Sequence, residues 1–346
     1  MNIYPPVSRR STGTYLGWHR LAFCLVALTV ATAAFARSEF SSIVVFGDSL
    51  SDTGRLFRLT HGGFPPRVAY YDGRQTNGPV WVEYLADRLD LEQRMKNYAV
   101  VGAMTGPTAA IPSGNVKSDD YPVGLEGTSL SGQFAQYLAA TGNKVDPEAL
   151  YIVEGGANDL IRPLAALLQN PPADFNQAVT ELATPTVINI ATIVGTLKGM
   201  GAQHIAVVNV PDLGKTPYLL GFGPTASYVV TYVVGIVNGA VAAQLDGIDL
   251  SGGKKIARID AFGFIDAVAA VPANFGFTNV IGQFMTRDPV TGEVTYAAPR
   301  PHAVARWFYW DDVHPTTRGH EFFAADALKT LRAAFPAAHE THGGCR

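Results

Sequence analysis

The 346-residue chain carries 26 basic and 29 acidic residues, so only 16% of it is charged, against about 25% in an average globular protein. This low charge, together with a hydrophobic content of 47%, excludes a disordered protein. The two cysteines, Cys24 and Cys345, exclude a disulfide scaffold and any zinc or redox site built on a Cys-x-x-Cys motif.

The first 36 residues have the layout of a secretory signal peptide, which the mature protein loses. Three arginines and no acidic residue precede an apolar run over residues 21–35, which ends in the small-x-small sequence Ala34-Phe35-Ala36. This run is shorter than the roughly 20 residues that cross a bilayer, so no permanent membrane anchor is expected. We therefore predict a signal peptide over residues 1–36 and a secreted or periplasmic protein. Its removal would leave 23 basic and 29 acidic residues, and the net charge of −6 argues against nucleic acid as a partner.

Strand and helix patterns alternate along the rest of the chain. Apolar, β-branched runs predict strands, and apolar residues at helical spacing predict helices. In chain order we predict a strand at 42–46, a helix at 80–89, a strand at 98–101, a helix at 130–140, a strand at 150–153, a helix at 174–200, a strand at 204–210, a helix at 227–245, a strand at 255–259 and a helix at 319–335. Thr128 or Ser129 is placed to cap the second helix, and Pro185 predicts a kink or two shorter helices in the third.

Five strands separated by helices predict a three-layer α/β/α fold with a parallel sheet and right-handed crossovers. No repeat, charge run or Pro/Gly/Ser linker divides residues 37–346, so we predict a single domain. The longest irregular stretches are 55–79, 104–127 and 275–309. In an open parallel sheet, ligands bind beyond the carboxyl ends of the strands, where such loops gather.

The sequence Gly47-Asp48-Ser49-Leu50 follows the first strand directly. This position places the Ser49 hydroxyl at the carboxyl edge of the sheet, where backbone N–H groups could face a developing negative charge. The tetrapeptide alone could equally be a turn without chemistry, but its place after a buried strand favours a functional role.

Two further residues at strand ends could serve an oxyanion. Gly102 ends the second strand, where a glycine lets the backbone approach a bound group closely, although glycine is also the usual turn residue. Asn158 follows the third strand, and its carboxamide could donate a hydrogen bond without carrying a charge. Asn158 or Asp159 could also cap the helix that begins near Leu160.

Asp311 and His314 lie together before the last helix. A nucleophilic serine needs a base of near-neutral pKa, and a histidine in that role needs a carboxylate to fix its tautomer. Three residues of separation let the two side chains meet in a turn, and Pro315 biases His314 away from the helical region. Asp312 is the alternative orienter, and the pair could otherwise be a solvated helix entry.

Together these motifs resemble the GDSL, or SGNH, hydrolase family, in its secreted bacterial lipase and esterase branch. Ser49, Gly102, Asn158 and His314 fall on the four positions that name the family, and Asp311 falls on that of the orienting acid. The resemblance covers nearly the full mature chain and is strongest at 46–54, 77–79, 211–214 and 310–316.

The resemblance implies a flavodoxin-like SGNH fold with five parallel strands, and carboxylic-ester hydrolysis without a metal or an organic cofactor. It implies that His314 takes the Ser49 proton, that Ser49 attacks the ester carbonyl to form an acyl-enzyme, and that Asp311 orients His314. The backbone N–H groups of Ser49 and Gly102 and the Asn158 side chain would then hold the oxyanion.

Two positions depart from the family pattern. Val101 stands where many members have a second glycine, which bears on the shape of the oxyanion loop. Glu154 places a charge near the end of a strand that is usually apolar. It could line the pocket or face solvent, and we expect it to face solvent.

Three other functions use the same residues or the same fold. A lipid acyltransferase would pass the acyl group to an alcohol instead of water, and a carbohydrate acetylesterase would remove acetyl groups. From a different class, a secreted binding module would keep the fold without catalysis, but the intact set of catalytic residue types argues against it.

We expect a small-molecule or lipid ester as the substrate because the irregular segments carry many aromatic side chains, which could equally belong to the core: Phe64, Tyr70, Tyr71, Phe275, Phe277, Phe284, Trp307 and Phe308. The remaining histidines lack a partner at ligand spacing and are expected to be structural or on the surface: His61, His204, His302, His320, His339 and His342.

Overall fold

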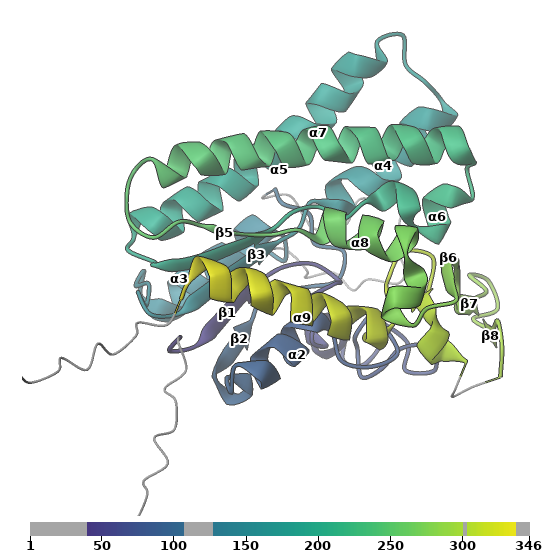
Figure 1. The fold of residues 1–346 in the computed structure, drawn as a ribbon, viewed down its shortest axis with the longest axis horizontal. Coiled ribbons are helices and arrows are strands. Elements are labelled where there is room, and N and C mark those ends of the chain that lie inside the picture. The colour runs from purple at the N-terminus through teal and green to yellow at the C-terminus, as the bar shows by residue number, and fades with distance from the viewer. Residues whose placement is uncertain (1–39, 107–126, 300–302, 337–346) are drawn as a thin grey trace, which may run out of the picture. The chain divides into compact units, whose positions relative to one another are not determined.

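The computed structural model of the protein describes residues 40–106, 127–299 and 303–336, all within one compact unit, Ser38–Arg346. The predicted signal peptide and most of the irregular stretch at 104–127 lie outside these residues. In the described part, helices cover both faces of a central sheet, which is the three-layer α/β/α arrangement expected from the sequence (Figure 1).

The central sheet has five strands: β1 (Ile43–Phe46), β2 (Met95–Asn97), β3 (Leu150–Glu154), β4 (His204–Val208) and β5 (Ala257–Ile259). Their order is β2-β1-β3-β4-β5, and every neighbouring pair is parallel. This is the flavodoxin-like order, in which ligands bind at the switch point between β1 and β3. The predicted five-stranded parallel sheet is confirmed.

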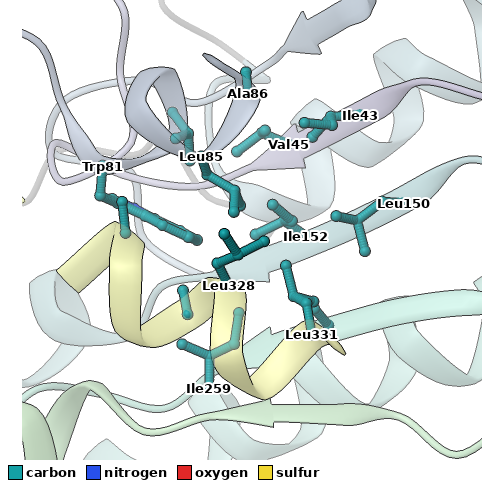
Figure 2. Packing of buried hydrophobic residues seen from close by; sticks show 14 of the residues in the cluster. Ile43, Val45, Trp81, Leu85, Ala86, Leu150, Ile152, Ile259, Leu328 and Leu331 are labelled. Atoms are coloured by element: carbon teal, nitrogen blue, oxygen red, sulfur yellow. The ribbon is translucent and has the colours of Figure 1, made fainter. Parts of the chain in front are cut away.

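One face of the sheet packs against α2 (Trp81–Arg88) and α9 (Thr317–Ala334). Successive residues of a strand point to opposite faces, so Val45 and Ile152 turn to this side. Figure 2 shows Leu328 of α9 directed at these strands, beside the side chains that α2 contributes. Burial on both faces explains why the strands read as continuous apolar runs.

The opposite face packs against α3 (Leu130–Thr141), α5 (Phe175–Gly199) and α7 (Pro224–Asp249). Val44 and Phe46, the alternate residues of β1, belong to this second cluster. Among the described residues, α5 and α7 are long and apolar enough to cross a membrane by length and composition alone, with mean hydropathies of 1.3 and 1.6. Both helices also supply buried core side chains against the sheet, as core helices do.

The remaining helices are α1 (Arg55–Leu59), α4 (Ala157–Gln169), α6 (Pro217–Leu220) and α8 (Ala261–Ala270), with 3₁₀ turns η1 (Glu92–Arg94), η3 (Leu213–Lys215), η4 (Pro272–Phe275) and η5 (Val304–Arg306). Ser129, one of the two predicted caps, accepts a hydrogen bond from the Gly132 N–H at the start of α3. Neither Asn158 nor Asp159 caps α4, because Gly156 occupies the cap position with a φ of 104° and both side chains fall in the first turn.

Two expectations of secondary structure need correction. The two shorter helices, one of the two outcomes predicted at Pro185, do not form, because Pro185 lies inside the single helix α5. Pro185 and Glu181, whose carbonyl it cannot bond, are both exposed, so water can replace the missing hydrogen bond. The second strand ends at Asn97, and the predicted strand at 98–101 is extended chain beside β1, where the Val100 N–H donates to the Gly47 carbonyl at 3.1 Å.

The irregular stretch at 275–309 forms two small sheets. In one, β6 (Asn279–Gln283) pairs with β9 (Trp307–Tyr309), and in the other, β7 (Met285–Arg287) pairs with β8 (Val294–Tyr296). β9 leads directly into the loop that carries His314, whose carbonyl accepts from the Trp310 N–H at 2.8 Å. These sheets therefore hold the loop that brings the predicted base to the central sheet.

Candidate active site

The structure brings the predicted catalytic residues together at the carboxyl edge of the central sheet. Ser49 follows β1, and His314 lies between β9 and α9. The His314 Nε2 atom lies 2.8 Å from the Ser49 hydroxyl oxygen, although 265 residues separate them. Its Nδ1 atom lies 2.9 Å and 2.8 Å from the two carboxylate oxygens of Asp311. Serine, imidazole and carboxylate therefore form a continuous hydrogen-bonded line.

Hydrogen-bond donors to both carboxylate oxygens stabilise the anion of Asp311. Its Oδ1 atom accepts from the backbone N–H groups of Val313 at 3.0 Å and His314 at 2.7 Å. Its Oδ2 atom accepts from the hydroxyl of Tyr70 at 2.8 Å. Burial alone would raise the pKa of Asp311, but the facing imidazole and these donors outweigh burial and lower it.

His314 is correspondingly more basic than an ordinary histidine. Burial opposes its charged form, but the Asp311 carboxylate outweighs burial and raises the pKa of His314 above 6.5. Asp312, the alternative orienter, also raises the His314 pKa by its charge, but less than Asp311 does. Its backbone carbonyl accepts from the Tyr218 N–H at 2.8 Å. The geometry therefore favours Asp311 as the orienter.

The turn over residues 47–50, here called the nucleophile turn after the role predicted for Ser49, is fixed by hydrogen bonds. At its start, Gln133 of α3 accepts from the Gly47 N–H and donates to the Gly47 carbonyl, both at 2.9 Å. Within it, the Asp48 carboxylate accepts from the Leu50 N–H at 3.0 Å. Ser49 is only 7% exposed, so the turn presents little more than its hydroxyl.

Gly102 adopts a φ of 77°, a left-handed conformation that favours glycine, and lines the cavity beside Ser49. Asp52 links its loop to the nucleophile turn, because its N–H donates to the Asp48 carbonyl at 3.0 Å and its Oδ2 atom accepts from the Val101 N–H at 3.0 Å. Val101, which stands where many family members have a second glycine, is buried in this loop.

Asn158 lines the same cavity from the first turn of α4. Its Nδ2 atom donates to Asp48 Oδ2 and to the Ala103 carbonyl, both at 3.1 Å. Both carboxamide hydrogens are thus already engaged, and an oxyanion would have to share one of them. Asp159 turns away from the site, where its carboxylate accepts from the Thr105 hydroxyl at 2.8 Å.

Glu154 does not face solvent, contrary to the expectation from sequence. It is 3% exposed at the end of β3, and its Oε2 atom accepts from the Asp48 N–H at 3.1 Å. Helices cover both faces of the central sheet, so neither face of β3 meets solvent and the charged side chain at its end turns inward. A Cβ atom on Gly47 would lie 2.8 Å from Glu154 Oε2, which accounts for the glycine there.

A cavity of about 250 Å³ opens at Ser49. Its wall is largely apolar and includes Leu50, Phe64, Ile161, Phe264 and Val313. Of the eight aromatic residues that could contact substrate or belong to the core, Phe64 and Tyr70 line the cavity, while Phe277, Phe284 and Phe308 are buried in core clusters. Among the described residues, no group of three or more His, Cys, Asp or Glu is arranged to hold a metal ion.

The other histidines divide between structure and surface where they are described. His320 is buried in the cavity wall, and burial lowers its pKa to about 3, so the ring is neutral. His204 is buried, and its Nε2 atom lies 2.6 Å from the ammonium of Lys254. His61 is exposed, whereas His302, His339 and His342 lie outside the described residues.

Residues 43–327 match the GDSL-like lipase/acylhydrolase family. The chain belongs to this family. A phosphatidylcholine-sterol acyltransferase of Aeromonas hydrophila is 34% identical over 58% of the chain and 53% of its own length. A thermolabile hemolysin of Vibrio parahaemolyticus is 23% identical over 86% of the chain and 65% of its own length, and a GDSL esterase/lipase of Arabidopsis thaliana is 23% identical over 90% and 96%. The chain therefore spans about half to two thirds of the length of the two bacterial relatives.

Proposed function

We propose that this GDSL-family chain is an exported serine ester hydrolase that works through an acyl-enzyme on Ser49. The observation that supports the proposal most directly is the line of hydrogen bonds from the Ser49 hydroxyl through His314 to Asp311. A hydroxyl in this arrangement can lose its proton to the imidazole while it attacks a carbonyl carbon. Export rests on the signal-peptide layout of residues 1–36.

In the first half of the reaction, His314 Nε2 takes the Ser49 proton as the hydroxyl oxygen bonds to the ester carbon. The carbonyl oxygen becomes an oxyanion, which the N–H groups of Ser49 and Gly102 and the shared carboxamide hydrogen of Asn158 would hold. His314 then gives the proton to the departing alcohol. In the second half, His314 takes a proton from water as the water oxygen bonds to the acyl carbon. It then returns that proton to the Ser49 oxygen as the bond to the acyl carbon breaks and the acid leaves. Loss of one oxyanion donor typically costs about 10²- to 10³-fold in rate.

The cavity favours an apolar acyl group of intermediate length. An engineered apolar cavity of about 150 Å³ holds the six carbons of benzene, so the volume of about 250 Å³ would hold roughly ten carbons. The apolar wall and the relatives named as lipase, hemolysin and acyltransferase support a lipid or small-molecule ester as the substrate. A single domain over residues 37–346 would carry the whole site.

Acyl transfer is the second candidate, because the relative with 34% identity is named as a phosphatidylcholine-sterol acyltransferase. The same acyl-enzyme would then react with a sterol or another alcohol instead of water. Product analysis with an added sterol separates the two, since a transferase forms a sterol ester while a hydrolase forms only the free acid.

The test is a series of p-nitrophenyl esters from acetate to palmitate with the purified protein. We expect activity to peak at intermediate acyl lengths and to disappear in Ser49→Ala. Ser251→Ala, which changes an exposed serine at the end of α7, is the matched control and should behave as wild type. Equal activity in wild type and Ser49→Ala would overturn the assigned nucleophile.

A further inference from the structure

Glu154 and Asp48 form a pair of buried carboxyl groups beneath the nucleophile turn, and the proposed reaction leaves Glu154 without a role. Glu154 is 3% exposed and Asp48 is 1% exposed. No ion pair among the described residues involves either group. Two carboxylates in contact cannot both stay ionised away from water, so the pair must hold a proton.

The hydrogen bonds indicate which group carries this proton. The two carboxyl groups lie close enough for each to act on the pKa of the other, and Glu154 Oε2 also accepts from the Asp48 N–H. Asp48 receives donors on both oxygens, from the Leu50 N–H and from Asn158 Nδ2, and these stabilise its anion. Within the described part of the chain, Glu154 accepts through Oε2, from the Asp48 N–H at 3.1 Å and the Ser51 hydroxyl at 3.0 Å. These bonds favour a protonated Glu154 beside an ionised Asp48.

The electrostatic surroundings agree with this assignment. Burial and then the charge of Asp48 raise the pKa of Glu154 well above its ordinary value of 4.5. The other titratable groups that act on Asp48 are Asp159 of α4 and His314 of the catalytic loop. Asp159 carries no positive charge and His314 is neutral in the active form, so neither would stabilise a second charge on Glu154.

Asp48 connects this pair to the reaction. Its Oδ1 atom fixes the nucleophile turn through the Leu50 N–H, and its Oδ2 atom accepts from Asn158 Nδ2 at 3.1 Å. A chain of donors fixes Glu154 in turn, because Trp81 Nε1 donates to the Ser51 hydroxyl at 3.0 Å and that hydroxyl donates to Glu154.

We infer that Glu154 is a positioning residue that acts as a neutral acid: its proton, shared with Asp48, holds that carboxylate where it directs the nucleophile turn and the Asn158 carboxamide. The inference rests on the proposed ester hydrolysis. Loss of the proton would place a second negative charge beside the site where the oxyanion develops. Activity should therefore fall at high pH, in addition to the fall at low pH that His314 causes.

The decisive variant is Glu154→Gln, which keeps a donor and an acceptor in the same shape but cannot ionise. At neutral pH we expect kcat/KM on a p-nitrophenyl ester to stay within about threefold of wild type, because a neutral amide reproduces the neutral acid. The alkaline fall seen in wild type should be absent, while the acid fall should be unchanged. A structural role alone would not remove one side of the pH profile.

Two further variants sharpen the result. Glu154→Leu removes the donor, and we expect kcat to fall about 10- to 100-fold with little change in KM, because the oxyanion donors act in the transition state. Glu148→Gln, at an exposed glutamate just before β3, is the matched control and should keep both sides of the profile. An alkaline fall that persists in Glu154→Gln, or a 100-fold loss in that variant at neutral pH, would overturn the inference.

A second measurement does not depend on activity. A folded-state pKa above the ordinary value means that folding binds the proton more tightly, so stability falls as pH rises above about 4.5 and through the raised pKa. We expect the Tm of wild type to decline over this range and that of Glu154→Gln to decline less. If no ester is hydrolysed but this difference in Tm appears, the proposed function fails while the shared proton stands. Equal slopes would refute the shared proton.

Discussion

Two buried carboxyl groups near Ser49 behave in opposite ways. Asp311 lies under His314, and the imidazole with three donors lowers its pKa despite burial. Glu154 lies under the nucleophile turn, and burial with a facing carboxyl group raises its pKa. Both side chains are almost wholly removed from solvent. The comparison shows that the charge and donors of the neighbours, rather than burial, decide which acid is ionised.

The largest expected effect is that of Asp311→Asn, which replaces the charged carboxylate beside His314 with a neutral amide. We expect kcat to fall by about 10⁴-fold, because an amide favours the wrong tautomer of His314 and does not stabilise its protonated form. The fall in the residual activity at acid pH should move to lower pH, because Asp311 is what raises the His314 pKa. Steady-state kinetics from pH 5 to 9 on a p-nitrophenyl ester provide the measurement. A loss below about tenfold would transfer the orienting role to another residue.

A smaller effect is expected for Tyr70→Phe, which removes one donor from the same carboxylate. A hydrogen bond to a charged group contributes about 1.5–3 kcal/mol, so we expect kcat to fall by about tenfold. The less satisfied Asp311 should raise the His314 pKa further, which moves the acid side of the profile to higher pH. Tyr71→Phe, at an exposed neighbour that does not line the cavity, is the control. A Tyr70→Phe profile that coincides with wild type would show that the backbone donors alone suffice.

The smallest effect is expected for Asp312→Asn. This carboxyl group influences His314 only through its charge, after Asp311. We expect kcat within about threefold of wild type and a slight shift of the acid side of the profile to lower pH. A loss that rivals the one expected for Asp311→Asn would contradict the assignment of the orienter.

The sequence could predict the sheet and the residues at its edge because both follow from local signals. An apolar run followed by Gly-Asp-Ser places Ser49 at a strand end, and the short spacing of Asp311 and His314 brings those side chains together in one turn. Parallel strands then bring distant strand ends to one edge, which places Asn158 near Ser49. The family resemblance added the roles that spacing alone left open.

The rest could not be predicted because it depends on contacts between distant segments without a periodic pattern. Tyr70 donates to a carboxylate 241 residues away and lies in a stretch that has no strand or helix pattern. Glu154 was expected on the surface because a glutamate is rarely buried unpaired, and its partner Asp48 is 106 residues earlier in the chain. The apolar run around Glu154 was the one signal that pointed to burial.

The close approach at Gly47 has an evolutionary consequence. A methyl group at position 47 would lie 2.8 Å from Glu154 Oε2 and 2.9 Å from Ser51 Cβ, so an alanine there displaces the acid that the turn rests on. The two positions should therefore covary in an alignment of relatives. Chains that keep the acid at position 154 should keep the glycine at 47, and chains that lose the acid must also move Ser51 before they can lose the glycine.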